Sequence, residues 1–427
     1  MRRLICRLCV FFLVFSLAAC GNSGNKSGDA DAFQIGFGRV DVTPAEPIHL
    51  WGYNDHVTRI SKGALHALYV HAIVMKGPDG KLMAMLTSDL CEGSTIILNE
   101  IRPLIKEQFG LESDQVVFGG THNHNAPDYG YNDQYDLQYK DVFKNGCLEA
   151  IEQAIDDMAP ATAEIGRTAT KNMTFVRRYY LSNGQMTGDN HNYDHNSTIV
   201  AHETEADEEI QLVRFKREGD HKDIVLVNWQ SHAAKHGHTD MISADFPGPL
   251  RDKVDKELDV HTVFYQGACG NLNPMSRIPG ESLITTGGYE GAVEVGERVA
   301  DYVIKALNTE GLMKRVETGN VRNTQRKFVG QETYDEANTI TCGELSFVTF
   351  PAEFYDTLGM QIKTGTPYKM TVLMGFHCGN GQYLPTYEAY LNGGYGPSNS
   401  RYVPGEGEKF VQFYLDILND MYQNENP

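Results

Sequence analysis

The chain has 427 residues, of which 41% are hydrophobic and 22% are charged, the composition of a soluble globular protein. Its formal net charge is −19, and it has no basic stretch that would neutralise phosphates, which argues against nucleic-acid binding. The same negative charge disfavours electrostatic attraction to anionic lipid headgroups.

The N-terminus resembles the leader of an exported bacterial lipoprotein. Three arginines precede the apolar run Val10–Leu17, which is too short to span a bilayer as a mature helix. The string Leu17–Cys20 resembles a lipobox, in which Cys20 is lipidated; an ordinary secretory signal is the alternative. We expect a signal peptide over residues 1–19 and a flexible polar tether over 20–32. These features predict a lipid-anchored protein of the bacterial envelope, periplasmic or in the outer membrane.

Strand-like and helix-like runs alternate along the rest of the chain. The β-rich runs 67–75 and 81–88 flank a Gly-Pro-Asp-Gly turn, which indicates a hairpin. Residues 94–109 have helical apolar spacing, and Gly110 follows them. Residues 179–207 are polar and aperiodic, and we interpret them as a long irregular loop. Further strands are expected over 115–118, 163–167, 210–216, 224–231, 262–266, 316–328, 344–350 and 370–375, and helices over 137–158, 246–258, 287–307, 353–364 and 406–423. The pattern predicts a single α/β domain over 33–427, with mixed sheets flanked by helices.

Two histidines lie just beyond the predicted strand 115–118, in the string Thr-His-Asn-His-Asn. On an extended backbone, side chains two positions apart point to the same side, so His122 and His124 are expected to face one cavity. This arrangement suits a metal or acid–base site. Two surface histidines, or one hydrogen-bonded core histidine, would give the same string.

A second group of histidines follows the apolar strand 224–231. His232 comes at the end of this strand, as His122 does at its own strand end, so the two are expected to converge. His236 and His238 fall in a predicted loop and are expected to line an entrance. Imidazole is a preferred zinc ligand, although a solvated histidine-rich loop would look the same.

Two further candidates come from the C-terminal third. Glu353 follows a strand end and Pro351, and is expected to begin a helix, where the helix dipole alone would favour a carboxylate. Tyr383 lies in an irregular Gly/Tyr-rich stretch and is expected to donate a hydrogen bond or to bind a metal weakly.

Taken together, these strings resemble the neutral/alkaline (non-lysosomal) ceramidase family, zinc amidases that cleave the N-acyl bond of ceramide. The match is co-linear over nearly the whole mature chain. It includes G-R-V-D-V-T-P (38–44), W-G-Y (51–53), T-S-D-L (87–90), T-H-N-H-N-A-P (121–127), N-W (228–229) with His232, I-S-A-D (242–245), G-A-C-G-N-L-N-P (267–274), F-P-A-E-F (350–354), G-Q-Y-L-P-T-Y-E-A-Y (381–390) and Y-G-P (395–397).

The resemblance implies roles for particular residues. Four residues of this chain correspond to the family's zinc ligands. The second histidine of the family's T-H-x-H string corresponds to His124, which would contact substrate or the bound water. A family arginine that faces the substrate carbonyl falls on Arg177 or Arg178. His124 or His236 would pass a proton to the leaving amine. The implied zinc ligands are His122, His232, Glu353 and Tyr383.

Two departures from the family pattern bear on the chemistry. Asn273 stands where ceramidases have a serine implicated in catalysis, and an amide side chain can hydrogen-bond a carbonyl but cannot act as a nucleophile. The additional C-terminal β domain of ceramidases is also expected to be absent. Both departures suggest a divergent member that keeps the metal centre.

The predicted function is therefore a zinc-dependent amidohydrolase for an N-acyl substrate such as ceramide or a related lipid. Zinc-activated water would attack the amide carbon, and the metal and Tyr383 would stabilise the oxyanion. The alternatives are a zinc hydrolase of an ester or an N-acyl sugar, and a non-catalytic ligand-binding envelope lipoprotein.

Overall fold

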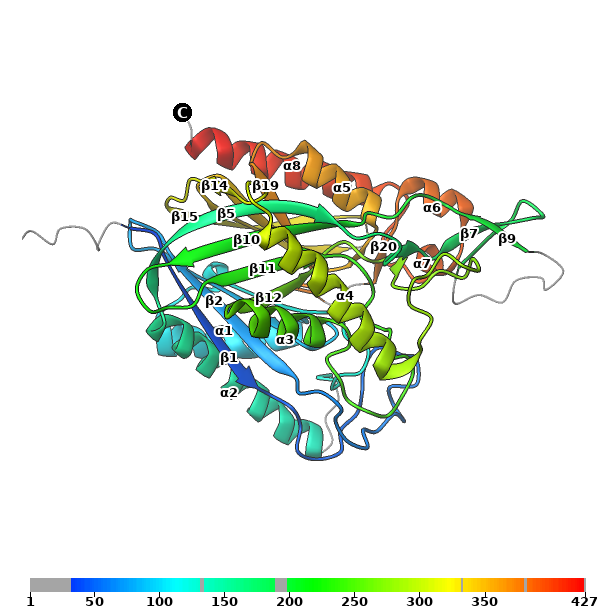
Figure 1. Cartoon of the computed structure of the whole chain (residues 1–427), viewed down its shortest axis with the longest axis horizontal. Coiled ribbons are helices and arrows are strands. Elements are labelled where there is room, and N and C mark those ends of the chain that lie inside the picture. The colour runs from blue at the N-terminus through cyan, green and yellow to red at the C-terminus, as the bar shows by residue number, and fades with distance from the viewer. Residues whose placement is uncertain (1–31, 131–133, 189–197, 332, 380–381, 426–427) are drawn as a thin grey trace, which may run out of the picture.

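In the computed structural model, the long helices lie in three groups against the two largest β-sheets (Figure 1). The structure describes residues 32–130, 134–188, 198–331, 333–379 and 382–425. Helices α5 and α8 run along one side of the molecule, and α1 and α2 along the opposite side. The α/β class with mixed sheets flanked by helices is confirmed.

The larger sheet has nine strands in the order β12-β11-β10-β5-β1-β2-β3-β4, with β14 paired to β5. Its neighbours are antiparallel except at the two ends, where β3 pairs with β4 and β11 with β12 in parallel. The strands are β1 (Gln34–Asp41), β2 (Tyr69–Lys76), β3 (Leu82–Ser88), β4 (Val116–Gly120), β5 (Ala159–Ala169), β10 (Glu209–Arg217), β11 (Ile224–Trp229), β12 (His261–Gln266) and β14 (Lys314–Val316).

The smaller sheet has four strands, β15 (Val321–Val329), β16 (Tyr334–Cys342), β17 (Leu345–Phe350) and β19 (Met370–Gly375). Its edge strand β19 contacts both β4 and β12, the two end strands of the larger sheet. The smaller sheet therefore joins the two ends of the larger one.

The helices bury alternate faces of these strands. On β11, Val225 and Val227 pack in a cluster with α3 and α4, whereas Ile224 and Leu226 belong to the core that includes Phe347 of the smaller sheet. This period of two is what a strand buried on both faces requires. The long helices are α1 (Thr95–Phe109), α2 (Gln134–Asp156), α3 (Pro247–Leu258), α4 (Gly288–Asn308), α5 (Asp356–Gly365) and α8 (Glu406–Glu425).

Three strand–helix–strand units carry the parallel pairs. Helix α1 connects β3 to β4, α3 connects β11 to β12, and α5 connects β17 to β19. Parallel strands end at the same edge of a sheet, and ligands in open α/β sheets bind beyond those carboxyl ends. The segments after these six strands are therefore where a site is expected.

Most predicted elements are confirmed, including the hairpin β2–β3 and helix α1. Ser94 caps the start of α1, and Gly110, at φ 71°, caps its end.

Three expectations about the elements are wrong. Residues 179–207 are not one irregular loop, because β7 (Arg178–Leu181), β8 (Met186–Gly188) and β9 (Ile199–His202) form a three-stranded sheet. The run 316–328 is interrupted at residues 317–320, which separate β14 from β15, and these two strands belong to different sheets. Glu353 does not begin a helix, because it lies in a two-residue strand and α5 starts at Asp356.

The short elements complete the fold. They are η1 (Ser113–Gln115), β6 (Phe175–Val176), β13 (Leu272–Asn273), β18 (Glu353–Phe354), β20 (Tyr383–Leu384), α6 (Tyr387–Asn392) and α7 (Tyr395–Ser398).

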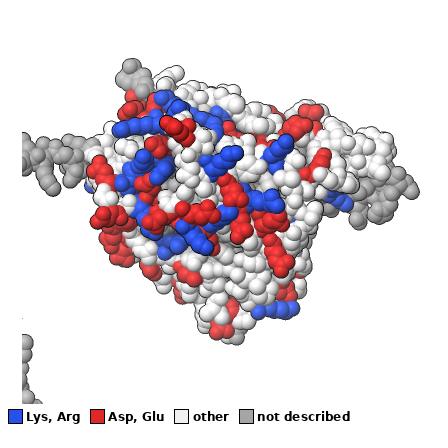
Figure 2. Space-filling view, in the orientation of Figure 1, with Lys and Arg blue, Asp and Glu red and all other residues white. Residues whose placement is uncertain are grey.

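The predicted signal peptide and Cys20 lie outside the described residues. Within the described ranges, no helix has the length and apolar character needed to span a membrane. On the face shown in Figure 2, acidic and basic side chains are interspersed, and the basic ones do not gather into a continuous patch.

Candidate metal centre

His122 follows strand β4 and enters the site through a left-handed backbone. The strand ends at Gly120, and His122 has a φ of 62°, a conformation that is uncommon for a residue with a side chain. The expected extended H-x-H backbone is therefore wrong. The two imidazoles nevertheless meet, with His122 Nε2 3.1 Å from His124 Nε2.

Neighbouring groups fix the His122 ring. Phe376, just after β19, stacks on it with ring centroids 3.7 Å apart and planes 11° apart. Its Nδ1 lies 3.2 Å from the carbonyl oxygen of Cys91, just after β3, and 3.5 Å from the Cys91 sulfur. Because a ring nitrogen must donate a proton to a carbonyl, the Nδ1–H tautomer is assigned, and Nε2 carries a lone pair.

His232, just after β11, is held in the same way. Its Nδ1 lies 2.8 Å from the carbonyl oxygen of Cys269 and 2.9 Å from that of Leu272, both beyond the end of β12. The Nε2 lone pair of His232 therefore also points into the site. Burial lowers the pKa values of both His122 and His232 well below the ordinary imidazole value, so both rings are neutral.

Glu353 brings a carboxylate to these two lone pairs. It lies just after β17, in β18, which pairs in parallel with β20 so that Glu353 is opposite Tyr383. Glu353 Oε2 is 3.0 Å from His232 Nε2 and 3.7 Å from His122 Nε2. The structure thus brings three of the candidate residues together, and the ligand atoms of His122, His232 and Glu353 all lie within 4.8 Å of one another.

This donor set fits a divalent metal ion. Two imidazole lone pairs and a carboxylate oxygen repel one another unless a positive charge lies among them. Neutral imidazoles and one carboxylate are a ligand set that catalytic zinc sites use, and the carbonyls that hold each Nδ1 are the outer partners that such ligands normally have. Arg177 brings a positively charged side chain to the cluster, with its Nη2 3.3 Å from His232 Nε2.

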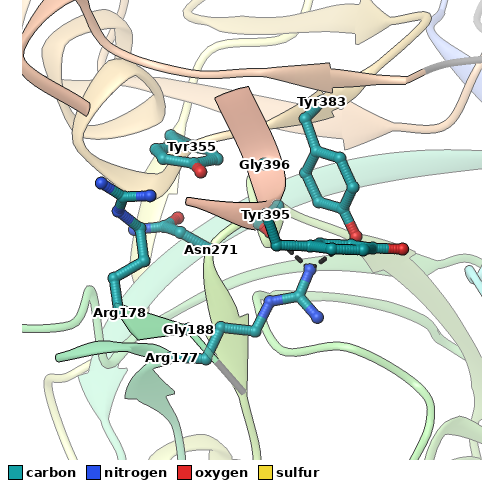
Figure 3. Close-up of a pocket in the computed structure, with 9 residues that line it drawn as sticks. Arg177, Arg178, Gly188, Asn271, Tyr355, Tyr383, Tyr395 and Gly396 are labelled. Carbon is teal, nitrogen blue, oxygen red and sulfur yellow. Dashed lines mark hydrogen bonds between the residues drawn. The ribbon is translucent and has the colours of Figure 1, made fainter. Parts of the chain in front are cut away.

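Arg177 and Tyr383 are in contact beside the cluster, and Figure 3 shows the Arg177 guanidinium next to the Tyr383 hydroxyl. Arg177 Nη2 donates to the Tyr383 hydroxyl oxygen at 2.7 Å and to the Gly270 carbonyl at 2.9 Å. Burial raises the pKa of Tyr383 well above its ordinary value, although Arg177 opposes this shift, so the phenol keeps its proton. Tyr383 is therefore opposite Glu353 and beside the cluster, and its role as a metal ligand stays a prediction.

The two adjacent arginines point in different directions (Figure 3). Arg178 donates to the Glu203 carboxylate at 2.9 Å and to the Gly393 carbonyl at 2.8 Å. Among the described residues, the geometry brings Arg177 into the site and ties Arg178 to the neighbouring β9 and α6 region.

The remaining predicted residues lie at different depths. His124 is half-buried, and its ring meets Tyr53 edge-on at 5.2 Å. Gly52 allows this approach, because a Cβ there would lie 2.5 Å from the His124 Cα. Asn273 is half-buried in β13, directly after Leu272, whose carbonyl holds His232.

His236 does not line an open entrance. It is 7% exposed, and its Nδ1 lies 2.8 Å from the Ser243 hydroxyl. Burial lowers the pKa of His236 to about 4. His238, in contrast, is exposed and lies 2.9 Å from Asp55. A role for His236 in substrate binding stays a prediction.

Sequence reasoning missed two features of the site. One is Cys91, which reaches His122 because β3 and β4 are parallel neighbours; the expected strand–helix–strand order of residues 81–118 was the available signal. The other is a reciprocal pair in which Asn271 Nδ2 donates to Asp356 at 2.7 Å and the Asp356 N–H donates back at 2.9 Å. These two residues are 85 positions apart, and no local motif marks them.

Comparison with known proteins gives the family of the chain and relatives of its fold. A neutral ceramidase of Oryza sativa subsp. japonica is 26% identical over 148 residues, which are 31% of this chain and 18% of that protein. The neutral ceramidase of Pseudomonas aeruginosa has the same fold at a TM-score of 0.75 and 14% identity, over 92% of this chain and 75% of that one. A ceramidase complexed with C2 matches at a TM-score of 0.73 and 14% identity, over 92% of this chain and 76% of that one. Residues 33–263 match the family described as neutral/alkaline non-lysosomal ceramidase, N-terminal, and the chain therefore belongs to that family.

Proposed function

We propose that this protein is a zinc-dependent amidohydrolase that cleaves the N-acyl bond of ceramide or a related N-acyl lipid. The observation that carries the proposal is the convergence of His122, His232 and Glu353 in a chain of the ceramidase family. The whole catalytic unit is taken to be residues 33–427.

The metal would be held by the two Nε2 atoms and the Glu353 carboxylate, with the Tyr383 oxygen beside them. A zinc ion so bound supplies a Lewis acid and lowers the pKa of water to ~7. The chain's own part is to keep both imidazoles neutral and aimed, which the carbonyls of Cys91, Cys269 and Leu272 do.

The wall made by Arg177 and Tyr383 is suited to the substrate carbonyl. Both groups are hydrogen-bond donors in a buried, low-dielectric site, and they are fixed to each other at 2.7 Å. Donors placed in advance where negative charge develops contribute about 3 kcal/mol each to transition-state stabilisation.

His124 is the proposed proton carrier. Its Nε2 is 3.1 Å from His122 Nε2, and its ring is half-buried, so it reaches both the centre and an incoming molecule. Burial lowers the pKa of His124 well below the ordinary value, so the ring is a neutral base that can accept a proton from water and deliver it to the leaving amine.

Asn273 replaces the family serine, and the proposed route needs no serine nucleophile. Its amide can hydrogen-bond a substrate carbonyl or hydroxyl but cannot form an acyl intermediate. This substitution favours, as a second candidate, the hydrolysis of a different ester or N-acyl substrate at the same centre. Anchoring through Cys20 in the bacterial envelope belongs to the same proposal.

Release of fatty acid from N-acyl sphingosine by purified protein, followed by mass spectrometry, tests the function. We expect turnover in the wild type, and a loss of at least 100-fold in His122→Ala and Glu353→Ala. His221→Ala, an exposed histidine away from the site, is the control and should keep full activity. Esterase activity without amide cleavage would instead support the second candidate. The absence of both activities would contradict both candidates.

A further inference from the structure

Arg59 is a buried arginine whose charge has no acidic partner among the described residues. Its side chain is 2% exposed. Asp55 and Asp240, whose charges act on it, pair instead with His238 and Lys62. A buried charge without a partner of opposite sign costs folding free energy, so stability alone does not explain this arginine.

The guanidinium of this arginine joins three stretches of chain through neutral acceptors. Its Nε donates to the Thr239 carbonyl at 2.8 Å, in the loop that follows His232. Its Nη1 donates to the Trp51 carbonyl at 3.2 Å, and its Nη2 donates to the His124 carbonyl at 2.8 Å. A planar fork of N–H donors reaches acceptors in several fixed directions, whereas the compact ammonium of a lysine does not.

Asn125 extends this network to the neighbouring loop. Its side-chain oxygen accepts a second hydrogen bond from Arg59 Nη2, and its amide donates to the Gly237 carbonyl at 3.1 Å. The main-chain N–H of His124 donates to the Ala233 carbonyl, also at 3.1 Å. The segment that carries His124 is therefore attached to the loop after β11 at two places, and Arg59 bonds to both residues of that segment.

Arg59 also acts on the His124 ring, through Tyr53. The Arg59 Cζ lies 4.8 Å from the centroid of the Tyr53 ring, and that ring meets the His124 ring edge-on at 5.2 Å. A guanidinium over an aromatic face is attracted to it. One arginine thus holds the main chain of His124 and the aromatic ring that packs against its imidazole.

We propose that Arg59 is a positioning residue for His124, and that it keeps the imidazole beside the metal centre, where the ring can pass a proton to the leaving amine. This inference rests on the proposed amide hydrolysis. The hydrogen bonds of Arg59 end on main-chain carbonyls and on Asn125, so the arginine acts through the geometry of other residues. A displacement of a reacting group by about 1 Å can lower a rate about 100-fold.

The test compares two substrates that share a dodecanoyl group, N-dodecanoyl sphingosine and p-nitrophenyl dodecanoate. The departing amine must take up a proton, whereas p-nitrophenolate leaves as an anion. At pH 8 a zinc-bound water with a pKa of ~7 is already ionised, so the ester needs no proton carrier. We expect Arg59→Lys to lower kcat for the amide about 100-fold, with KM changed less than about twofold, and to lower kcat for the ester less than about threefold.

Arg217→Lys is the matched control. Arg217 is 7% exposed and donates to the Asp157 carbonyl at 3.0 Å, so it too is a buried arginine that holds main chain. It ends β10, beyond the residue that pairs with the first residue of β11, whereas the metal centre lies past the last residue of β11. This variant should lower the unfolding midpoint in urea and leave both rates unchanged. Glu112→Gln, at an exposed carboxylate paired with Lys106, should change neither property.

Tyr53→Leu keeps the test decisive if Arg59→Lys does not fold. It removes only the aromatic contact, and it should lower kcat for the amide about tenfold and kcat for the ester less than about twofold. In a His124→Ala background, Arg59→Lys should cause no further loss on the amide, because both changes remove the same function. The inference is overturned by equal losses on the two substrates, by no loss on either, or by a full further loss in the His124→Ala background.

A crystal structure separates this inference from the proposed function. If the zinc-loaded wild type does not cleave the amide, the proposed function fails, and zinc-loaded crystals of the wild type and of Arg59→Lys or Tyr53→Leu still measure the position of His124. A separation of the His122 and His124 Nε2 atoms that is larger by about 1 Å in the variant supports the inference. The same separation in wild type and variant contradicts it.

Discussion

At the scale of single residues, the centre depends on which ring nitrogen of each histidine is occupied. His122 and His232 both use Nδ1 to hold main-chain carbonyls, so both leave Nε2 for the cluster. Three different loops supply these carbonyls and the Glu353 carboxylate, and each loop follows a parallel strand. The ligand directions are thus set by backbone positions rather than by rotamer choice alone.

His377 provides a prediction about pH and stability. It is fully buried, its Nδ1 lies 2.6 Å from the Gly375 carbonyl, and burial lowers its pKa to about 4 from the ordinary 6.5. Between these pH values the unfolded chain binds a proton that the folded chain does not. The folded state therefore loses about 3 kcal/mol of stability as the pH falls from 6.5 to 4.

Urea unfolding at a series of pH values checks this. His377→Asn, which keeps a donor for Gly375, should be less stable at pH 7 because it leaves a cavity, but it should lose less stability on acidification. His221→Gln, exposed, should follow the wild type. A wild-type stability that is flat between pH 6.5 and 4.5 would contradict the prediction.

At the scale of elements, the pairing of Asn271 with Asp356 connects two sides of the site. Asn271 lies between Gly270 and Leu272, whose carbonyls hold Arg177 and His232. Asp356 starts α5, three residues after Glu353. The pair therefore sets the distance between the loop that aims His232 and the strand that carries the carboxylate.

Removing this pair should weaken both zinc binding and the fold. We expect Asn271→Ala to lower zinc affinity by about 10- to 100-fold, as outer partners of metal ligands generally do, and to lower stability by about 1–3 kcal/mol. Competition with a chelator gives the affinity, and urea unfolding gives the stability. Asn99→Ala, on the exposed face of α1, is the control.

A double-variant cycle with Asp356→Ala gives the sharper result. Since both changes break the same pair, their effects on zinc affinity should not add. Additive losses would mean that the two residues act independently.

The elements also show how far the sequence could predict this structure. Hydrophobic period and capping residues placed α1 and the β2–β3 hairpin, because those signals are local. The segment 179–207 was misjudged because its strands are only three or four residues long and pair only with one another. Glu353 was expected on a helix because proline and a carboxylate are helix-start signals, whereas pairing with β20 decided its conformation.

The site, like the fold, could be predicted only where its signals are local in the sequence. The four candidate ligands came from co-linear motifs, which need no geometry. Cys91, the left-handed backbone of His122 and the Asn271–Asp356 pair depend on which strands are neighbours, and residues far apart in sequence determine that.

At the scale of the whole molecule, three strand–helix–strand units end at one place. The parallel pairs β3–β4, β11–β12 and β17–β19 contribute, in turn, Cys91 with His122, His232 with its carbonyls, and Glu353 with Phe376. A metal ion that binds only when all three are assembled should stabilise the fold as well as supply chemistry, by about 4 kcal/mol when its free concentration is 1,000 times its Kd.

Anomalous diffraction at the zinc absorption edge, from crystals of protein purified without chelator, tests the central claim most directly. The account predicts one strong peak per chain, within bonding distance of His122 Nε2, His232 Nε2 and the Glu353 carboxylate and next to the Tyr383 oxygen. The peak should disappear in Glu353→Ala and persist in Glu112→Gln. A peak elsewhere, or none in crystals grown with added zinc, would contradict it.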